Sequence, residues 1–270
     1  MKDIKAISID WEGTVVYSPK DEKPWPLDCI SKLSILLQAI FKEEGIFSFI
    51  NTGRQTPFVE AIFASKIIVP IKGCPSITEN GSCLFYPITN TFKLNPLITE
   101  GKLKRFLFER VGLERLVQQL GGKMELGKNF MFSARPPENI KVVDFYSEIK
   151  KEIQALIDDK IVEITYSSSA VDVTIYGVNK ITGINFWCDI MGIGKQHLSA
   201  IGDSAGDNSV LQEVTFPMAP ANAADDTKAI VSQKGYISPY PICVGVIDAI
   251  GKIVHTAGLQ KMCQDFIKEA

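Results

Sequence analysis

Short apolar runs alternate with helical patterns at both ends of the chain, and this alternation constrains the fold more than any other feature. Between residues 4 and 71 the order is strand, helix, strand, helix, strand, with apolar runs at 4–9, 46–50 and 67–71. A helix between two such runs returns the chain to a parallel neighbouring strand. The sequence therefore predicts an α/β fold with a doubly wound parallel sheet.

The alternation is interrupted in the middle of the chain and then resumes. The interruption contains two helical patterns and several strand-like runs, at 103–120, 123–133, 143–157, 160–166 and 170–176. From residue 180 the helix and strand order returns, with apolar runs at 198–201 and 215–219. We therefore expect an α/β core domain formed by residues 1–82 and 178–270, with residues 83–177 inserted as an α+β domain.

Composition excludes several classes of partner. The 270 residues are 46% hydrophobic and 22% charged, which is enough apolar material for a core. The net charge is -2 and there is no long basic run, so we expect no nucleic acid and no membrane surface as partner. The sequence has no signal-peptide pattern, and its six cysteines include no Cys-x-x-Cys pair. These features predict a cytoplasmic protein with reduced thiols.

Carboxylates follow two of the predicted strands. Asp10 and Glu12 come after the first apolar run, beside Gly13, and Asp203 and Asp207 follow the run at 198–201. The carboxyl ends of parallel strands are where open α/β sheets bind ligands. Neighbouring carboxylates repel unless a proton or a cation intervenes, and Mg²⁺ prefers oxygen ligands. We therefore expect a divalent metal here; the alternative is that these acids cap helices or lie in solvent.

Two further residues fit chemistry at phosphorus. Thr52 follows the run at 46–50 and can donate a hydroxyl hydrogen bond to a phosphoryl oxygen, while Lys180 can supply a fixed positive charge. Beside a metal, Asp10 can act as the nucleophile, and Glu12 as the acid that protonates the leaving alkoxide and then as the base for water. The ordinary alternatives are a helix-capping Thr52 and an exposed Lys180. Arg54 is expected to pair with a nearby acid.

Four motifs occur in a fixed order along the chain. They are Asp-Trp-Glu-Gly-Thr at 10–14, Asn-Thr-Gly-Arg at 51–54, Gly-Val-Asn-Lys at 177–180 and Gly-Asp-Ser-Ala-Gly-Asp at 202–207. In these motifs the chain resembles the haloacid dehalogenase (HAD) superfamily of phosphatases, and specifically its Cof-type branch with a large α+β (type IIB) cap. The resemblance spans nearly the whole chain, although in the cap it depends on element order alone. It implies a Rossmann-like core with an inserted cap domain.

The resemblance also implies roles for individual residues. Asp10 is expected to form an aspartyl-phosphate, and Thr52, Gly53 and Lys180 to bind the phosphate. Mg²⁺ is expected to be held by Asp10, the backbone carbonyl of Glu12, Asp203 and Asp207, the last as a ligand or beside the ligands. The family usually has aspartate where this chain has Glu12, and the added methylene moves the proton donor. The family also usually has asparagine where this chain has Gly206.

These expectations lead to one hypothesis and two alternatives. The hypothesis is a Mg²⁺-dependent phosphomonoesterase that acts on a small phosphorylated metabolite, either a sugar phosphate or a phosphoglycolate-like acid. The first alternative is a phosphomutase on the same scaffold. The second is a binding or regulatory protein that keeps the fold and has lost turnover through Glu12.

Overall fold

A five-stranded parallel sheet lies at the centre of the computed structural model, which describes residues 3–18, 21–167 and 169–269. Its strand order is β12-β11-β10-β1-β2. The strands are Ala6–Ile9 (β1), Phe47–Ile50 (β2), Leu198–Ile201 (β10), Phe216–Ala219 (β11) and Tyr236–Ile237 (β12). Strand β1 pairs in parallel with both β2 and β10, so the first strand of the chain lies inside the sheet. The predicted parallel sheet is confirmed.

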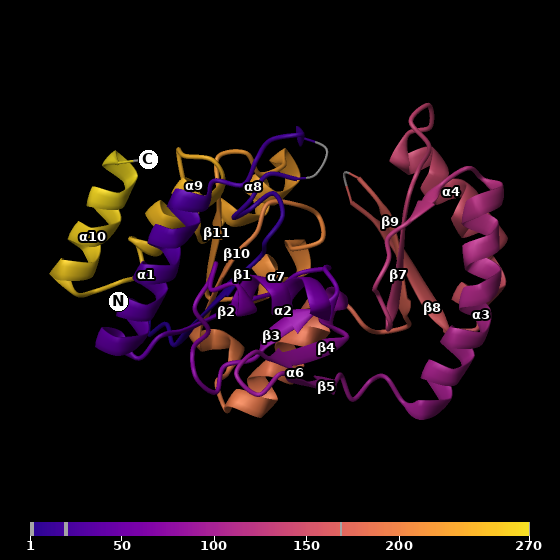
Figure 1. Cartoon of the computed structure of the whole chain (residues 1–270), viewed down its shortest axis with the longest axis horizontal. Coiled ribbons are helices and arrows are strands. Elements are labelled where there is room, and N and C mark those ends of the chain that lie inside the picture. The colour runs from indigo at the N-terminus through magenta and orange to yellow at the C-terminus, as the bar shows by residue number, and fades with distance from the viewer. Residues whose placement is uncertain (1–2, 19–20, 168, 270) are drawn as a thin grey trace.

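Helices cover both faces of this sheet (Figure 1). One apolar cluster includes residues of α1 (Leu27–Glu44), α2 (Thr56–Ala64), α9 (Ile242–Ile250) and α10 (Ala257–Lys268). A second includes residues of α6 (Lys180–Met191), α7 (Asn208–Glu213) and α8 (Asp225–Val231). Successive strand residues point to opposite faces, so Ile7 belongs to the first cluster and Ala6 to the second. The sheet is therefore doubly wound.

Two parts of the core differ from the sequence prediction. The apolar run at 67–71 contains no strand in the structure, although Ile68 and Ile71 are buried. Pro70 lies within this run and has no N–H to donate to a sheet, which explains the difference. Helix α10 was not predicted, although Leu259, Met262 and Phe266 recur at helical spacing and pack on the first cluster.

A small antiparallel sheet follows α2 and changes the expected domain boundary. It consists of β3 (Ser76–Thr78), β4 (Cys83–Tyr86) and β5 (Thr91–Leu94), and the short helix η2 (Glu79–Gly81) lies between β3 and β4. Leu84 packs in the same apolar cluster as Trp187 of α6, and Phe85 packs in the cluster of α1. We therefore propose that residues 83–94 belong to the core domain and that the inserted domain begins near residue 95 instead of residue 83.

The inserted domain contains a four-stranded antiparallel sheet of order β6-β7-β9-β8. The strands are Lys123–Met124 (β6), Met131–Arg135 (β7), Val162–Tyr166 (β8) and Val171–Ile175 (β9). Helices α3 (Glu100–Gln119) and α4 (Val142–Glu152) lie on the side of the sheet away from the core (Figure 1), and the short helix α5 (Gln154–Asp158) follows α4 and contacts β8. The predicted strand 123–133 is interrupted, because residues 125–130 form a loop between β6 and β7.

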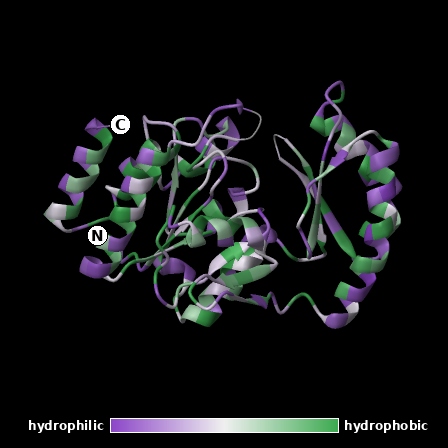
Figure 2. Ribbon diagram, viewed as in Figure 1, coloured by the Kyte–Doolittle hydropathy of each residue, from purple (hydrophilic) through white to green (hydrophobic). Residues whose placement is uncertain are grey.

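Helices α3 and α10 carry both hydrophilic and hydrophobic residues along their length (Figure 2). Each can therefore pack one side on the protein, α3 on the inserted sheet and α10 on α1 and α9, while the other side meets solvent. Over the described ranges of the chain, we find no helix with the length and apolarity needed to cross a membrane. The return from the inserted domain runs through residues 177–179 into α6, so Lys180 stands at the junction of the two domains.

Candidate active site

Asp10 lies directly after β1, at the carboxyl edge of the parallel sheet. Strand β1 separates β2 from β10, so the sheet reverses its winding direction at this strand. Such a reversal is where open α/β sheets form their ligand crevice. The backbone N–H of Asp10 donates to the carbonyl of Ile201, and that of Asn51 donates to the carbonyl of Ile9. These bonds align the residues that follow β1, β2 and β10 along one edge.

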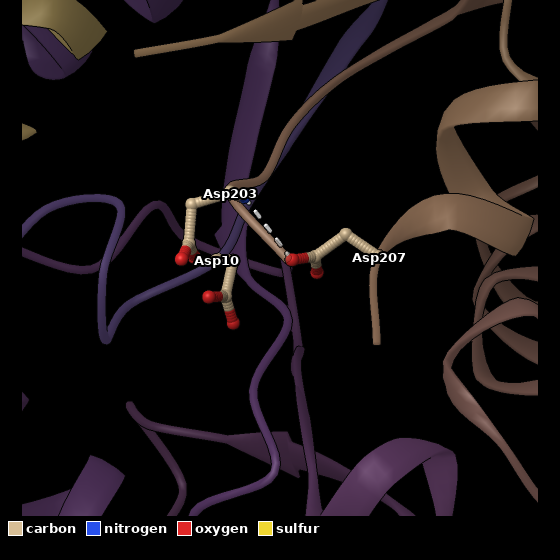
Figure 3. A group of neighbouring side chains, drawn as sticks. All are labelled: Asp10, Asp203 and Asp207. Carbon is tan, nitrogen blue, oxygen red and sulfur yellow. Dashed lines mark hydrogen bonds between the residues drawn. The ribbon is translucent and has the colours of Figure 1, made fainter. Parts of the chain in front are cut away.

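Three carboxylates meet at this edge (Figure 3). Asp10, Asp203 and Asp207 each offer an oxygen, and these oxygens lie within 4.8 Å of one another. The hydroxyl of Thr14 donates to Asp203 Oδ1 at 3.0 Å. Asp207 Oδ2 accepts the backbone N–H groups of Asp203 at 3.2 Å and Ser204 at 3.3 Å. Local hydrogen bonds therefore fix the orientation of two of the three acids.

Lys180 joins two of these carboxylates. Its Nζ donates to Asp10 Oδ1 at 2.7 Å and to Asp207 Oδ1 at 2.6 Å. Lys180 is the first residue of α6, and the side chain of Asn179 caps this helix, so the lysine is held where the chain returns to the core. Burial opposes the charged ammonium, but the two carboxylates outweigh it and raise the pKa of Lys180.

The acids at this site lack enough positive charge among their protein neighbours. Burial, followed by the charge of Asp207, raises the pKa of Asp10 well above its usual range. The same two causes raise the pKa of Asp203 to about 7. Lys180 is one cation among three carboxylates, so the cluster favours an additional cation or bound protons.

Thr52 and Gly53 lie beside this cluster, as the sequence predicts. Thr52 follows β2, donates its N–H to the carbonyl of Ile77, and accepts the N–H of Arg54 on its Oγ1 at 3.2 Å. Thr52 and Gly53 line the same cleft as Asp10, Lys180 and Asp203. The structure therefore brings together the predicted residues that follow β1, β2 and β10 and the lysine that begins α6.

Glu12 has a different environment from the three aspartates. Its carboxylate forms two contacts with Arg54: Nε donates to Oε2 at 2.6 Å, and Nη2 contacts Oε1. The side chain of Glu12 is not part of the aspartate cluster. Arg54 also lies 3.9 Å, through Nη1, from Glu125 Oε2 in the inserted domain. The predicted pairing of Arg54 with a nearby acid is confirmed, and its partner is Glu12.

The inserted domain forms the opposite wall of the cleft, whose volume is about 720 Å³. Glu125, Lys128, Glu163 and Asp172 lie on this wall, and none of them was predicted from the sequence. The sequence of strands β8 and β9 does indicate a sheet with one polar face, since apolar residues alternate there with Glu163, Thr165, Asp172 and Thr174. Glu125 and Lys128 lie in the loop after β6, where no periodicity identifies a lining residue.

Two asparagines fix the loops around the site. Asn222 Nδ2 donates to the carbonyl of Gly13 at 2.7 Å, and its Oδ1 accepts the N–H of Ile242 at 2.8 Å. Asn222 therefore links the loop after β1 to the start of α9. Asn80 Nδ2 lies 3.5 Å from Asp172 Oδ2 across the two domains. Arg135 pairs with Glu125 at 2.9 Å, and Lys123 is exposed.

Three similarities to known proteins agree with this geometry. Residues 135–239 match the sequence profile of the haloacid dehalogenase-like hydrolases. A curated protein of Methanobrevibacter smithii, named phosphoglycolate phosphatase, is 26% identical over 93% of this chain and 99% of its own length. A crystal structure from Thermoplasma acidophilum superposes with a TM-score of 0.66 at 20% identity, covering 93% of this chain and 96% of that one.

A fourth similarity is to the sucrose-phosphatase of Synechocystis, whose structure contains sucrose and phosphate. It superposes with a TM-score of 0.66 at 15% identity, covering 93% of this chain and 98% of that one. At such identities the solved structures support the fold alone. The profile match over residues 135–239 indicates a haloacid dehalogenase-like hydrolase, and the fold and the cluster of acids at its carboxyl edge agree with that class. The matched profile and the curated relative point to a phosphatase within this superfamily, and we propose that it belongs to the Cof-type branch.

Proposed function

We propose that this phosphatase is a Mg²⁺-dependent phosphomonoesterase that acts on a small phosphorylated metabolite through an aspartyl-phosphate on Asp10. The observation that carries the proposal is the position of Lys180, whose ammonium joins Asp10 to Asp207 in the floor of a cleft between two domains. A nucleophilic carboxylate needs positive charge beside it before a phosphate dianion can approach, and this lysine supplies part of that charge.

The residues present fit Mg²⁺. The donors are carboxylate oxygens from Asp10, Asp203 and Asp207, and hard oxygen donors are those that Mg²⁺ prefers. The raised pKa of Asp203 has its cause in the same crowding of acids, which a divalent cation would relieve. The backbone carbonyl of Glu12 remains a proposed further ligand. When bound, the metal would offset the repulsion between Asp10 and the phosphate and polarise the phosphoryl group.

The chain's own residues supply the remaining steps. Asp10 attacks phosphorus, while the Thr52 hydroxyl and Lys180 hold phosphoryl oxygens in place. Glu12 donates a proton to the departing alkoxide and then accepts one from the water that hydrolyses the aspartyl-phosphate. Water is limited during the first step by the inserted domain, which covers the site as a cap.

Arg54 gives the unusual Glu12 a defined position. A glutamate has one more rotatable bond than the aspartate expected at this place, so an unrestrained side chain would sample more orientations. The two contacts from the Arg54 guanidinium restrict it to the wall of the cleft near the inserted domain.

Size supports a substrate larger than a minimal phosphate ester. A cleft of about 720 Å³ lies within the range of pockets that bind drug-sized ligands. Similarity to a phosphoglycolate phosphatase and to a sucrose-phosphatase supports phosphoglycolate-like acids and sugar phosphates as candidate classes. The cytoplasmic location and the lack of nucleic acid or membrane partners stay predictions of the sequence.

Hydrolysis of p-nitrophenyl phosphate with and without Mg²⁺ tests the proposal. The native protein should release phosphate only with the metal, and Asp10→Asn should abolish release while leaving the thermal unfolding transition in place. Full activity of Asp10→Asn would refute the mechanism. With a sugar phosphate as substrate, free phosphate as the product excludes the phosphomutase alternative.

Glu12→Asp tests the role of Glu12 and the binding or regulatory alternative. A large gain in rate would mean that the native glutamate limits turnover. An absence of activity in both the native protein and Glu12→Asp would favour a protein that binds phosphate esters without hydrolysing them.

A further inference from the structure

The sheet of the inserted domain presents one apolar face and one polar face. Phe132, Val171 and Val173 enter the apolar cluster formed with α3 and α4. The intervening residues line the cleft: Glu163 and Thr165 on β8, and Asp172 and Thr174 on β9. Strand pairing sets Thr165 opposite Asp172 and Glu163 opposite Thr174. Two carboxylates and two hydroxyls therefore form a contiguous patch that faces the leaving-group side of the active site.

The cation on this wall already has partners. Lys128 is almost fully buried, lies 3.0 Å from Glu125 Oε2 and 3.9 Å from Asp172 Oδ1, and donates to the hydroxyl of Ser133. Arg54, across the cleft, contacts both Glu12 and Glu125. An incoming carboxylate would therefore have to compete with existing carboxylate partners for either cation.

The wall formed by the inserted domain has more negative than positive side chains, and most of its charged groups accept hydrogen bonds. Among the described residues of the inserted domain that line the cleft, three are acids and one, Lys128, is a cation. Carboxylates accept hydrogen bonds and cannot donate them when ionised, and Glu125 stays ionised because Lys128 and Arg54 outweigh its burial and lower its pKa to about 2. Ligand groups that donate hydrogen bonds or carry positive charge match such a wall, whereas ligand carboxylates are repelled.

We infer that the inserted domain selects substrates by the charge of the leaving group, with Asp172 and Glu163 as specificity-determining residues. Phosphate monoesters with an amine-bearing leaving group are preferred, those with a hydroxyl-bearing group come next, and those with a carboxylate are rejected. The inference rests on the proposed phosphomonoesterase function and deepens it. It also separates this chain from the substrate that the name of its methanogen relative indicates.

Three two-carbon esters test the inference at constant size. They are 2-aminoethyl phosphate, 2-hydroxyethyl phosphate and phosphoglycolate, which differ mainly in the terminal amine, hydroxyl or carboxylate. We expect kcat/KM for the amine to equal or exceed that for the hydroxyl, and kcat/KM for the carboxylate to be about tenfold lower than for the hydroxyl. A carboxylate that reacts as fast as the hydroxyl, or an amine that reacts more slowly than the hydroxyl, would overturn the inference.

Asp172→Asn tests whether the acidic patch causes the preference among the three esters. The substitution removes one negative charge at nearly constant shape, so kcat/KM for phosphoglycolate should rise about tenfold relative to the hydroxyl ester. Glu163→Gln should act in the same direction, and it is the variant to use if Asp172→Asn does not fold, since its amide oxygen can still accept the N–H of Gly177. Unchanged ratios in the folded variants would contradict the inference.

Glu114→Gln is the matched control for these two variants. It makes the same change in charge on α3, where Glu114 pairs with Arg110 and does not line the cleft. The ratios should stay at their native values. A shift as large as that of Asp172→Asn would mean that net charge, and not the patch, sets the selectivity.

Binding by Asp10→Asn separates the inference from the proposed function. Calorimetric titration of this variant with the three esters needs no turnover and should give the affinity order amine, hydroxyl, carboxylate. If the native protein hydrolyses nothing but this order holds, the proposed function fails and the inference stands. If p-nitrophenyl phosphate is hydrolysed and phosphoglycolate binds best, the inference fails and the proposed function stands.

Discussion

Gly13 offers a sharp test of the site, because two separate physical demands meet at this residue. Its φ of +81° lies in the left-handed region, and a Cβ built on it would lie 2.3 Å from Asp203 Oδ2. An L-residue in this conformation costs about 1–2 kcal/mol, even with empty space around it. The clash adds a second effect. Real Cβ atoms essentially never lie closer than 3.0 Å to such a neighbour, so the Asp203 carboxylate must move away from the new Cβ.

Gly45 separates these two effects. It follows α1 with a φ of +69°, and a Cβ built on it would meet nothing within 4 Å. Gly45→Ala should therefore lower the free energy of unfolding by about 1 kcal/mol and leave activity unchanged. Gly13→Ala should lose at least as much stability and also displace Asp203, which reduces kcat/KM by roughly 10²-fold and weakens Mg²⁺ binding.

Urea denaturation, p-nitrophenyl phosphate hydrolysis and Mg²⁺ titration of both variants provide the measurements. The comparison uses two glycines with similar backbone strain, so any difference in activity reports the clash with Asp203. Native kcat/KM and native Mg²⁺ affinity in Gly13→Ala would refute the reasoning. An equal loss of activity in Gly45→Ala would refute it as well, because strain alone would then account for both.

Three further variants probe charges and contacts elsewhere in the structure. Lys180→Met leaves Asp10 and Asp207 without their shared cation, so phosphatase activity should disappear and urea unfolding should show a loss of about 3 kcal/mol; native stability would contradict this. Glu79 is buried, and its Oε2 accepts the N–H groups of Asn129 and Phe130. Glu79→Ala should therefore lower the free energy of unfolding by roughly 1–3 kcal/mol and accelerate hydrogen exchange at those two amides. Unchanged exchange at both amides would contradict this prediction. The depressed pKa of Glu125, about 2 against an ordinary 4.5, means that its stabilisation is complete above pH 4.5 and is lost as the pH falls towards 2. Between pH 4.5 and 2 the free energy of unfolding should therefore fall by roughly 1–3 kcal/mol less in Glu125→Gln than in the native protein. Parallel curves for the two proteins would argue against the pairing of Glu125 with Lys128 and Arg54.

The core of the fold was predictable because its signals are local. Apolar runs followed by helical periodicity predict parallel strands, and Gly45 occupies the left-handed position at the end of α1 where the sequence places a helix end. Where the local signal was ambiguous, the prediction was wrong. The run at 67–71 is as apolar as a strand, but Pro70 leaves it without strand pairing, and its side chains are buried in a loop.

The positions of Asp10, Thr52, Lys180 and Asp203 also follow from order along the chain. Three of these residues come immediately after a strand or one residue later, and parallel strands bring such positions to one edge of the sheet. Lys180 is the exception, since it begins a helix at the return from the inserted domain. Motif order placed it beside the others, and the structure supplies the physical contact through Asp10 and Asp207.

By itself the sequence determined the parallel core and the acidic edge, because both depend on short stretches and their order. Only the tertiary structure decided what faces that edge. Whether Glu163 and Asp172 line the cleft depends on which side of the inserted sheet α3 and α4 cover, and no local pattern contains that choice. The partner of Glu12 was decided in the same way, since Arg54 reaches it only after β1 and β2 pair.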